Sequence, residues 1–72
     1  MTNKIELGEL LAKHRIKHGY KQKQIAKILD IDRSSVTSYE TGRNMPNIFT
    51  LIQLSELYNI SILNLISTII AK

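Results

Sequence analysis

The stretch from Gln22 to Glu40, QKQIAKILDIDRSSVTSYE, has apolar residues at helical spacing on both sides of a short turn. Ile25 and Leu29 fall on one face of a first helix. Val36 and Tyr39 fall on one face of a second helix, which begins with small polar residues. Two short helices joined in this way predict a helix-turn-helix over residues 21–41, and both helices need a core behind them to hold their angle.

Residues at the ends of these two helices predict where each one begins and stops. We expect Asp30 and Ile31 to make the turn, and Asp32 to cap the second helix by accepting hydrogen bonds from its free amide groups. Gly42 follows the second helix, at a position where a residue in the left-handed region commonly ends a helix.

Three further segments have apolar residues at helical spacing, and no segment shows the sustained alternation of a strand. The first runs from about Ile5 to His18 and is ended by Gly19, the second is capped by Asn47, and the third, over about 61–70, is capped by Ser61. Their expected buried faces are Leu7, Leu11, His14 and His18; Leu51, Leu54 and Leu57 with Ile52 or Tyr58; and Ile62, Leu65, Ile66 and Ile69. The chain, residues 1–72, is therefore predicted to be one all-α domain, a compact five-helix bundle.

The composition restricts how such a small bundle can be held together. Seventy-two residues with 43% hydrophobic content suit one core, and the absence of cysteine excludes disulfides and thiolate metal sites. His14 and His18 stand one helical turn apart, like two metal ligands, but no third ligand accompanies them, and we expect no metal or other cofactor. No nucleophile with an orienting base, pair of carboxylates or glycine-rich phosphate loop can be assembled, so we expect no enzyme.

Positive charge is concentrated on the predicted helix-turn-helix and its flanks. Residues 13–43 contain eight basic and three acidic residues, whereas the whole chain has a net charge of +4. A positive surface over a helix-turn-helix favours double-stranded DNA as the partner. A solvated lysine-rich surface is the alternative when the charge is considered alone.

Neither end of the chain has the pattern of a membrane or exported protein. Lys4, Glu6 and Glu9 interrupt any apolar run near the N-terminus, so no targeting signal is predicted and the expected location is the cytoplasm. The apolar run ISILNLISTIIA is shorter than the roughly 20 residues that span a bilayer, and we expect no membrane contact.

Several features follow one another in a fixed order between Leu7 and Ile66: Arg15; QKQIA, starting at Gln22; RSSVTSYETG, starting at Arg33; Pro46; and LIQLSELYNIS, starting at Leu51. Together they resemble the Cro and phage-repressor type of helix-turn-helix domain, often called the XRE family. The resemblance implies the lambda-repressor-like bundle and sequence-specific DNA binding. Asp30 stands where the family commonly has glycine, and aspartate tolerates the left-handed region better than most residues.

The second helix of the motif carries the candidate base contacts. Arg33 offers two donors that match guanine, and Thr37 can place a methyl group against thymine. Contact of Arg33 with phosphate alone is the alternative. The predicted base-contacting residues are Arg33, Ser34, Thr37 and Ser38.

Residues on either side of this helix are candidates for contacts with the DNA backbone. Gln22 begins the first helix of the motif, where its amide can bond a phosphate oxygen, and the resemblance implies that it also supports the recognition helix. The loop after Gly42 is polar and basic. For both elements, plain solvent-exposed surface is the alternative. The predicted backbone contacts are Lys21, Gln22, Lys23, Arg43 and Asn44.

Arg15 and Glu40 are assigned to the structure of the domain rather than to DNA. The resemblance implies that they form a partly buried salt bridge between the first helix and the end of the recognition helix.

The last helix has more apolar residues than a small core needs. Leu63 and Ile70 stand where such domains more often have polar residues, so we expect a homodimer interface formed by Leu63, Ile66, Ile69 and Ile70, with completion of a monomeric core as the alternative. A dimer would place two recognition helices in successive major grooves, which predicts a repressor on an inverted-repeat operator. The alternative function is an antitoxin-like or other protein-interaction module, and a regulatory protein partner fits either function.

Overall fold

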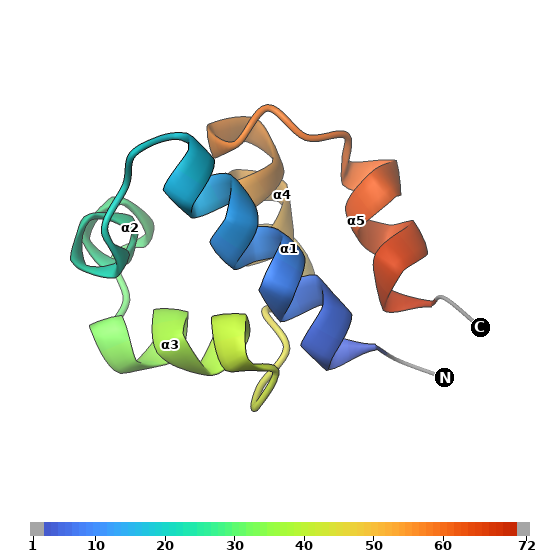
Figure 1. Cartoon of the computed structure of the whole chain (residues 1–72), viewed down its shortest axis with the longest axis horizontal. Coiled ribbons are helices and arrows are strands. Elements are labelled where there is room, and N and C mark those ends of the chain that lie inside the picture. Colours follow the sequence, from blue (N-terminus) through green and yellow to red (C-terminus); the bar gives the residue numbers. More distant parts are fainter. Residues whose placement is uncertain (1–2, 71–72) are drawn as a thin grey trace.

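A computed structural model describes residues 3–70, and these residues form five α-helices and no strand (Figure 1). The helices are α1 (Lys4–Lys17), α2 (Gln22–Leu29), α3 (Arg33–Thr41), α4 (Ile48–Leu57) and α5 (Ile62–Ile69). The all-α prediction is confirmed, and α2 and α3 form the predicted helix-turn-helix. The helix limits predicted from the sequence agree with these bounds at nearly every end.

The side chain of the N-cap residue caps three of the five helices. Asn3, Asn47 and Ser61 accept hydrogen bonds from first-turn amides of α1, α4 and α5, at 3.2, 2.9 and 3.2 Å. The cap expected for α3 is wrong in its detail, because Asp32 occupies the N-cap position but its carboxylate accepts no amide hydrogen bond. The backbone oxygen of Asp32 instead accepts from the amide of Ser35 at 3.0 Å.

Two residues in the left-handed region determine where α2 and α3 stop. Asp30 ends α2 at φ 57° and ψ 48°, which confirms that aspartate takes the place of glycine in this turn. Gly42 ends α3 at φ 79°. The amide of Arg43 then donates to the backbone oxygen of Ser38 at 2.9 Å and turns the chain back across the end of α3.

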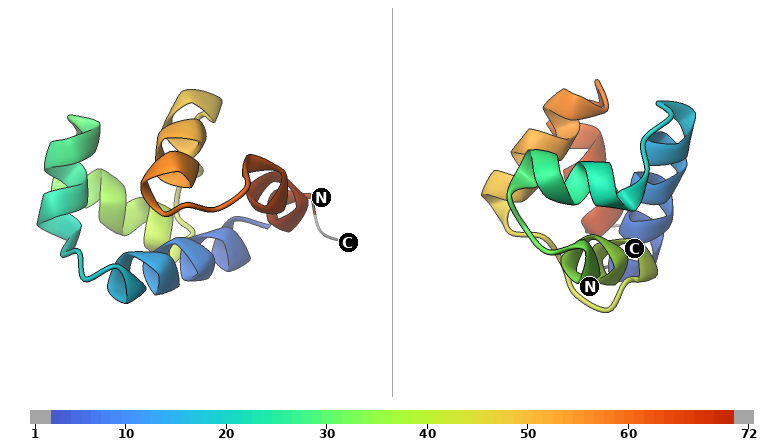
Figure 2. Two further views of the ribbon diagram at one scale, coloured as in Figure 1. Left: turned by 90° about the horizontal axis from the view of Figure 1, so that it is seen from above. Right: turned by 90° about the vertical axis from the view of Figure 1, so that its left-hand side faces the viewer.

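All five helices, together with Tyr58 after α4, contribute to one apolar core. Its buried side chains are Leu7, Leu11, Ile25, Ala26, Leu29, Val36, Leu51, Leu54, Tyr58, Leu65 and Ile69. α2 and α3 lie at one end of the molecule and α5 at the other, with α1 and α4 between them (Figures 1 and 2). The amide of Asn3 donates to the backbone oxygen of Ile69 at 2.8 Å, so the start of α1 is joined to the end of α5.

The predicted buried face of α1 needs a correction near the end of the helix. Leu7 and Leu11 are buried, but His14 is only half-buried and His18 is exposed. The ring of His14 lies 6.3 Å from that of Tyr58, centroid to centroid. Burial, followed by neighbouring positive side chains, lowers the pKa of His14 and favours its neutral form.

Tyr58, rather than Ile52, completes the buried face of α4. Tyr58 is 2% exposed, whereas Ile52 is 41% exposed and Leu57 is half-buried. Burial, followed by the negative charge of Glu40, raises the pKa of the Tyr58 hydroxyl. An aromatic ring just after α4 therefore takes the core position for which the sequence left two candidates.

α1 and α3 approach each other closely at Gly8. A Cβ atom added to Gly8 would lie 2.5 Å from the backbone oxygens of both Tyr39 and Glu40. Backbone atoms cannot move aside as the end of a flexible side chain can, so this helix contact requires glycine. The contact fixes the C-terminal part of α3 against α1.

Gly8→Ala should therefore destabilise the fold, although alanine normally stabilises a helix interior by about 0.5 to 1 kcal/mol relative to glycine. We expect a loss of about 1 to 3 kcal/mol, because α1 and α3 must move apart. Urea unfolding followed by circular dichroism measures the free energy of unfolding. Glu9→Ala, at an exposed position of the same helix, is the matched control. A Gly8→Ala variant as stable as the wild type would contradict the close contact.

Candidate nucleic-acid interface

α3 lies along one edge of the molecule, with one side free of other helices (Figures 1 and 2). Arg33, Ser34 and Thr37 are exposed, and Ser38 is half-buried. Val36 of the same helix is 3% exposed and packs in the core. The structure therefore brings the four predicted base-contacting residues together on one helix and leaves three of them exposed to solvent. Their contact with bases stays a prediction.

A row of hydrogen bonds links α1, α2 and α3, and we call its members, Arg15, Glu40, Gln22 and Thr37, the polar network. Arg15 Nε on α1 donates to Glu40 Oε2 on α3 at 2.7 Å, so the predicted ion pair is present. Gln22 Nε2 on α2 donates to Glu40 Oε1 at 2.9 Å. Thr37 Oγ1 on α3 donates to Gln22 Oε1 at 2.9 Å. The network thus runs from the partly buried ion pair to the exposed side of α3.

Burial makes the ion pair important for the geometry of this edge. The side chains of Arg15 and Glu40 are 14% and 6% exposed. A carboxylate removed from water needs donors for its oxygens, and Arg15 and Gln22 supply one to each. Arg15 also donates from Nη1 to the backbone oxygen of Tyr20 at 2.8 Å, which fixes the connection between α1 and α2.

Gln22 supports α3 through its side chain, as the resemblance implied. The side chain is half-buried at the first position of α2, and both its oxygen and its nitrogen bind residues of α3. The NH₂ group of an amide has two hydrogens, of which Glu40 accepts one. The second hydrogen is the donor that Gln22 can offer to a phosphate.

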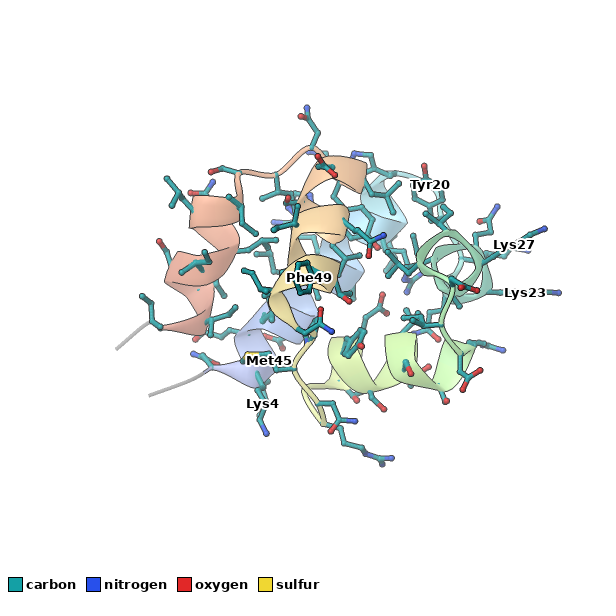
Figure 3. All side chains as sticks on the ribbon, turned by 180° about the vertical axis from the view of Figure 1, so that it is seen from behind. Lys4, Tyr20, Lys23, Lys27, Met45 and Phe49 are labelled. Carbon is teal, nitrogen blue, oxygen red and sulfur yellow. The ribbon has the colours of Figure 1, made fainter. Side chains whose placement is uncertain are left out.

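The other predicted backbone contacts lie beyond the two ends of the recognition helix. Lys21 and Lys23 are exposed at the start of α2, and Arg43 and Asn44 are exposed in the loop after α3. Figure 3 shows Lys23 and Lys27 extending from α2 away from the body of the molecule. The ion pair of the polar network is the only one among residues 3–70, so these cations have no acidic partner there.

Lys4 is a further cation at this edge that the sequence reasoning missed. Figure 3 shows it near Met45, pointing toward the same side as the outward side of α3. The first turn of α1 packs on the loop after α3, since a Cβ atom added to Gly42 would lie 2.8 Å from Ile5 Cα. No local signal around Lys4 indicates this position, because only the packing of α1 on the loop creates it.

The predicted dimer residues of α5 do not share one environment. Leu63 and Ile70 are 69% and 61% exposed, and Ile66 is half-buried. Ile69 is a correction to the predicted interface, because its side chain is 8% exposed and belongs to the core of its own chain. α4 adds an exposed aromatic side chain that the sequence reasoning did not single out, Phe49, which is 75% exposed (Figure 3).

Residues 3–70 contain no group of three or more His, Cys, Asp or Glu side chains that could hold a metal ion. Across the same residues, no helix has the length and apolar character needed to cross a membrane.

Comparison with known proteins agrees with this geometry. Residues 11–65 match the family model described as Helix-turn-helix. The chain belongs to the helix-turn-helix family. The resemblance to Cro and phage-repressor type domains is thereby confirmed.

Three known proteins show how far the similarity extends. The HTH-type transcriptional regulator ImmR of Bacillus subtilis (strain 168) is 40% identical over 57 residues, which cover 79% of this chain and 45% of ImmR. The crystal structure of a transcriptional regulator from Listeria innocua has a TM-score of 0.78 at 32% identity, covering 88% of this chain and 59% of that one. The restriction-modification controller protein C.AhdI from Aeromonas hydrophila shares the fold, with a TM-score of 0.75 at 24% identity over 85% of this chain and 92% of that one. The chain thus spans about half the length of ImmR and of the Listeria protein.

Glu40→Ala should cost on the order of 3 kcal/mol of stability, because Arg15 would keep a partly buried charge without its partner. The double variant Arg15→Met, Glu40→Leu should lose less stability than the summed losses of its two component single variants, Arg15→Met and Glu40→Leu, since no uncompensated charge remains. Urea unfolding of the wild type, both single variants and the double variant measures this coupling. Strictly additive losses would show that the two side chains do not stabilise each other.

Proposed function

We propose that this chain is the sequence-specific DNA-binding domain of a transcriptional regulator, with α3 as the helix that enters the major groove. The observation that carries the proposal is the free side of α3, where Arg33, Ser34 and Thr37 are exposed while the polar network holds the helix from behind. Membership in the helix-turn-helix family supports it. The similarity to ImmR, an HTH-type transcriptional regulator, supports the regulatory role.

The proposed contacts divide between bases and the DNA backbone. The exposed residues of α3 face the base edges, where an arginine can donate two hydrogen bonds to guanine. Residues 21–23 on one side, and Arg43, Asn44 and Lys4 on the other, face phosphates. Phosphate contacts on both sides of the helix fix its register in the groove but carry no sequence information themselves. Specificity therefore rests on α3.

We further propose that two copies of the chain bind an inverted repeat and repress transcription by occupying the operator. Leu63 on α5 and Ile70 directly after it are more than half exposed, and Ile66 between them in the sequence is half-buried. Large apolar side chains that stay exposed together favour burial against another protein chain. A two-fold dimer would present its recognition helices to major grooves about 34 Å apart. A regulatory protein partner would act on this assembly.

A second candidate function, an antitoxin-like or other protein-interaction module, draws on α4. Phe49 is 75% exposed, and Ile48 and Ile52 are 48% and 41% exposed. A set of exposed apolar residues marks an interaction surface. In this case a partner protein is the main ligand and DNA binding is secondary. A heteromeric complex that Phe49→Asp abolishes, with isolated DNA binding intact, would favour this candidate.

Selection of bound sequences from a random DNA pool should enrich an inverted repeat, and failure to enrich any sequence would contradict sequence-specific binding. Arg33→Ala should then weaken binding to the enriched sequence by about 1 to 3 kcal/mol more than binding to random DNA, because a base contact is lost. Fluorescence anisotropy at one fixed salt concentration measures both affinities. Lys27→Ala, which removes the same charge from α2, is the control. Equal losses on both DNAs would make Arg33 a phosphate contact.

Leu63→Asp should convert the dimer to a monomer, because a charge in an apolar interface has no partner there. Sedimentation velocity over a range of concentrations measures the dissociation constant, which should rise at least about tenfold. Ile16→Asp is the matched control, since Ile16 on α1 is 66% exposed and Leu63 is 69% exposed. A wild-type chain that stays monomeric, or a Leu63→Asp variant that dimerises as the wild type does, would refute an α5 interface.

A further inference from the structure

We propose that Thr37 meets DNA only as a hydrogen-bond acceptor and a methyl group, and never as a donor. The base that faces Thr37 is then selected for a donor group or for the thymine methyl, and guanine is disfavoured. This inference rests on the proposed function, in which the exposed side of α3 faces the bases. The polar network carries it, because the direction of each hydrogen bond in the network follows from the one before it.

The carboxylate of Glu40 pairs with Arg15 at 2.7 Å, and the two oxygens of a carboxylate in such a pair can only accept hydrogen bonds. The Gln22 side chain lies 2.9 Å from the second of these oxygens. The atom of Gln22 that faces Glu40 must therefore be the NH₂ nitrogen, because an amide oxygen there would meet another acceptor.

The other end of the same amide faces Thr37. With its nitrogen turned to Glu40, Gln22 presents its oxygen to Thr37, at 2.9 Å from Oγ1. An amide oxygen can only accept, so the hydroxyl group of Thr37 must donate. The carboxylate of Glu40 thus determines the direction of the Gln22 amide, and the amide determines the direction in which the Thr37 hydroxyl donates.

The hydroxyl group of Thr37 has a second acceptor within reach. Thr37 Oγ1 also lies 3.3 Å from the backbone oxygen of Arg33, which is an acceptor as well. A threonine hydroxyl has one hydrogen. Whether that hydrogen points to Gln22 or to Arg33, it stays inside the protein, and only lone pairs and the methyl group remain for a ligand.

The consequence for base selection follows from the groups that bases expose in the major groove. Adenine N6 and cytosine N4 donate hydrogen bonds, thymine exposes a methyl group, and guanine offers only the acceptors N7 and O6. If Thr37 can only accept, it can bond adenine N6 or cytosine N4 and pack on the thymine methyl group. Opposite guanine, its lone pairs would face the acceptors N7 and O6, and no hydrogen bond could form. By contrast, the Ser34 side chain makes no hydrogen bond within residues 3–70, so its hydroxyl can both donate and accept.

The first experiment compares base preferences at one position of the selected DNA sequence. Thr37→Ala, in a repeat of the random-pool selection, identifies the position that Thr37 faces as the one whose preference changes. We expect the wild type to exclude guanine there. If adenine or cytosine is selected, Thr37→Val should lose about 3- to 10-fold affinity for that base while binding the guanine duplex no more weakly. If thymine is selected, Thr37→Ser should lose affinity and Thr37→Val should not.

A second variant tests whether Gln22 holds the hydrogen. Gln22→Ala removes the nearer internal acceptor and leaves only the longer bond to the backbone oxygen of Arg33, at 3.3 Å, so discrimination against guanine should weaken in part at the position of Thr37 and at no other. A purely structural role of Gln22 would instead weaken binding to all sequences alike. Unchanged discrimination at the Thr37 position in a folded Gln22→Ala variant would overturn the role assigned to Gln22.

The outcomes separate this inference from the proposed function. Selection of guanine at the position of Thr37, with the preference lost in Thr37→Val, would overturn the inference while sequence-specific binding stands. A Thr37→Ala variant that enriches the wild-type sequence without change would overturn it as well. A wild-type chain that enriches no sequence would instead refute the proposed function.

Discussion

The edge of the molecule that carries α3 depends on the carboxylate of Glu40. This side chain is 6% exposed, and each of its oxygens receives a hydrogen bond, from Arg15 at 2.7 Å and from Gln22 at 2.9 Å. A buried carboxylate without these donors would cost several kcal/mol. α1 and α2 must therefore stay where their donors reach it, and the glycine contact at Gly8 brings α1 close enough to α3 for this. The orientation of α3 is fixed by polar contacts as well as by its one fully buried apolar side chain, Val36.

Most helix limits could be predicted because local residues determine them. Asn47 and Ser61 cap the helices that follow them, and Gly42 ends α3 in the left-handed region. Predictions failed where packing between helices decides the outcome. Asp32 has the right position and residue type for a cap, but its side chain makes no such bond. The sequence places Ile69 both on the buried face of the last helix and in a dimer interface, and the packing of α5 on the other helices keeps it in the core of its own chain.

The sequence could indicate which residues form the polar network, but it could not indicate the direction of the hydrogen bonds between them. The pairing of Arg15 with Glu40 could be inferred from the family resemblance, and the structure contains it. The direction of the Gln22 amide depends on where α1, α2 and α3 meet, which no segment of the sequence specifies alone. Lys4 was missed for the same reason, because its place near the recognition helix results from the packing of α1 on the loop at Gly42.

The polar network also determines which positions of α3 can change without loss of the fold. Within residues 3–70 the side chains of Arg33 and Ser34 make no hydrogen bond or ion pair, so substitutions there alter what the surface presents at little cost in stability. Thr37 differs, because its hydroxyl binds Gln22 and any substitution changes both the surface and the network behind it. Glu40 cannot change alone, since Arg15 would be left with a partly buried charge. A chain of 72 residues without cysteine can thus vary the first turn of its recognition helix freely, whereas the middle and end of that helix are constrained by the contacts that hold it in place.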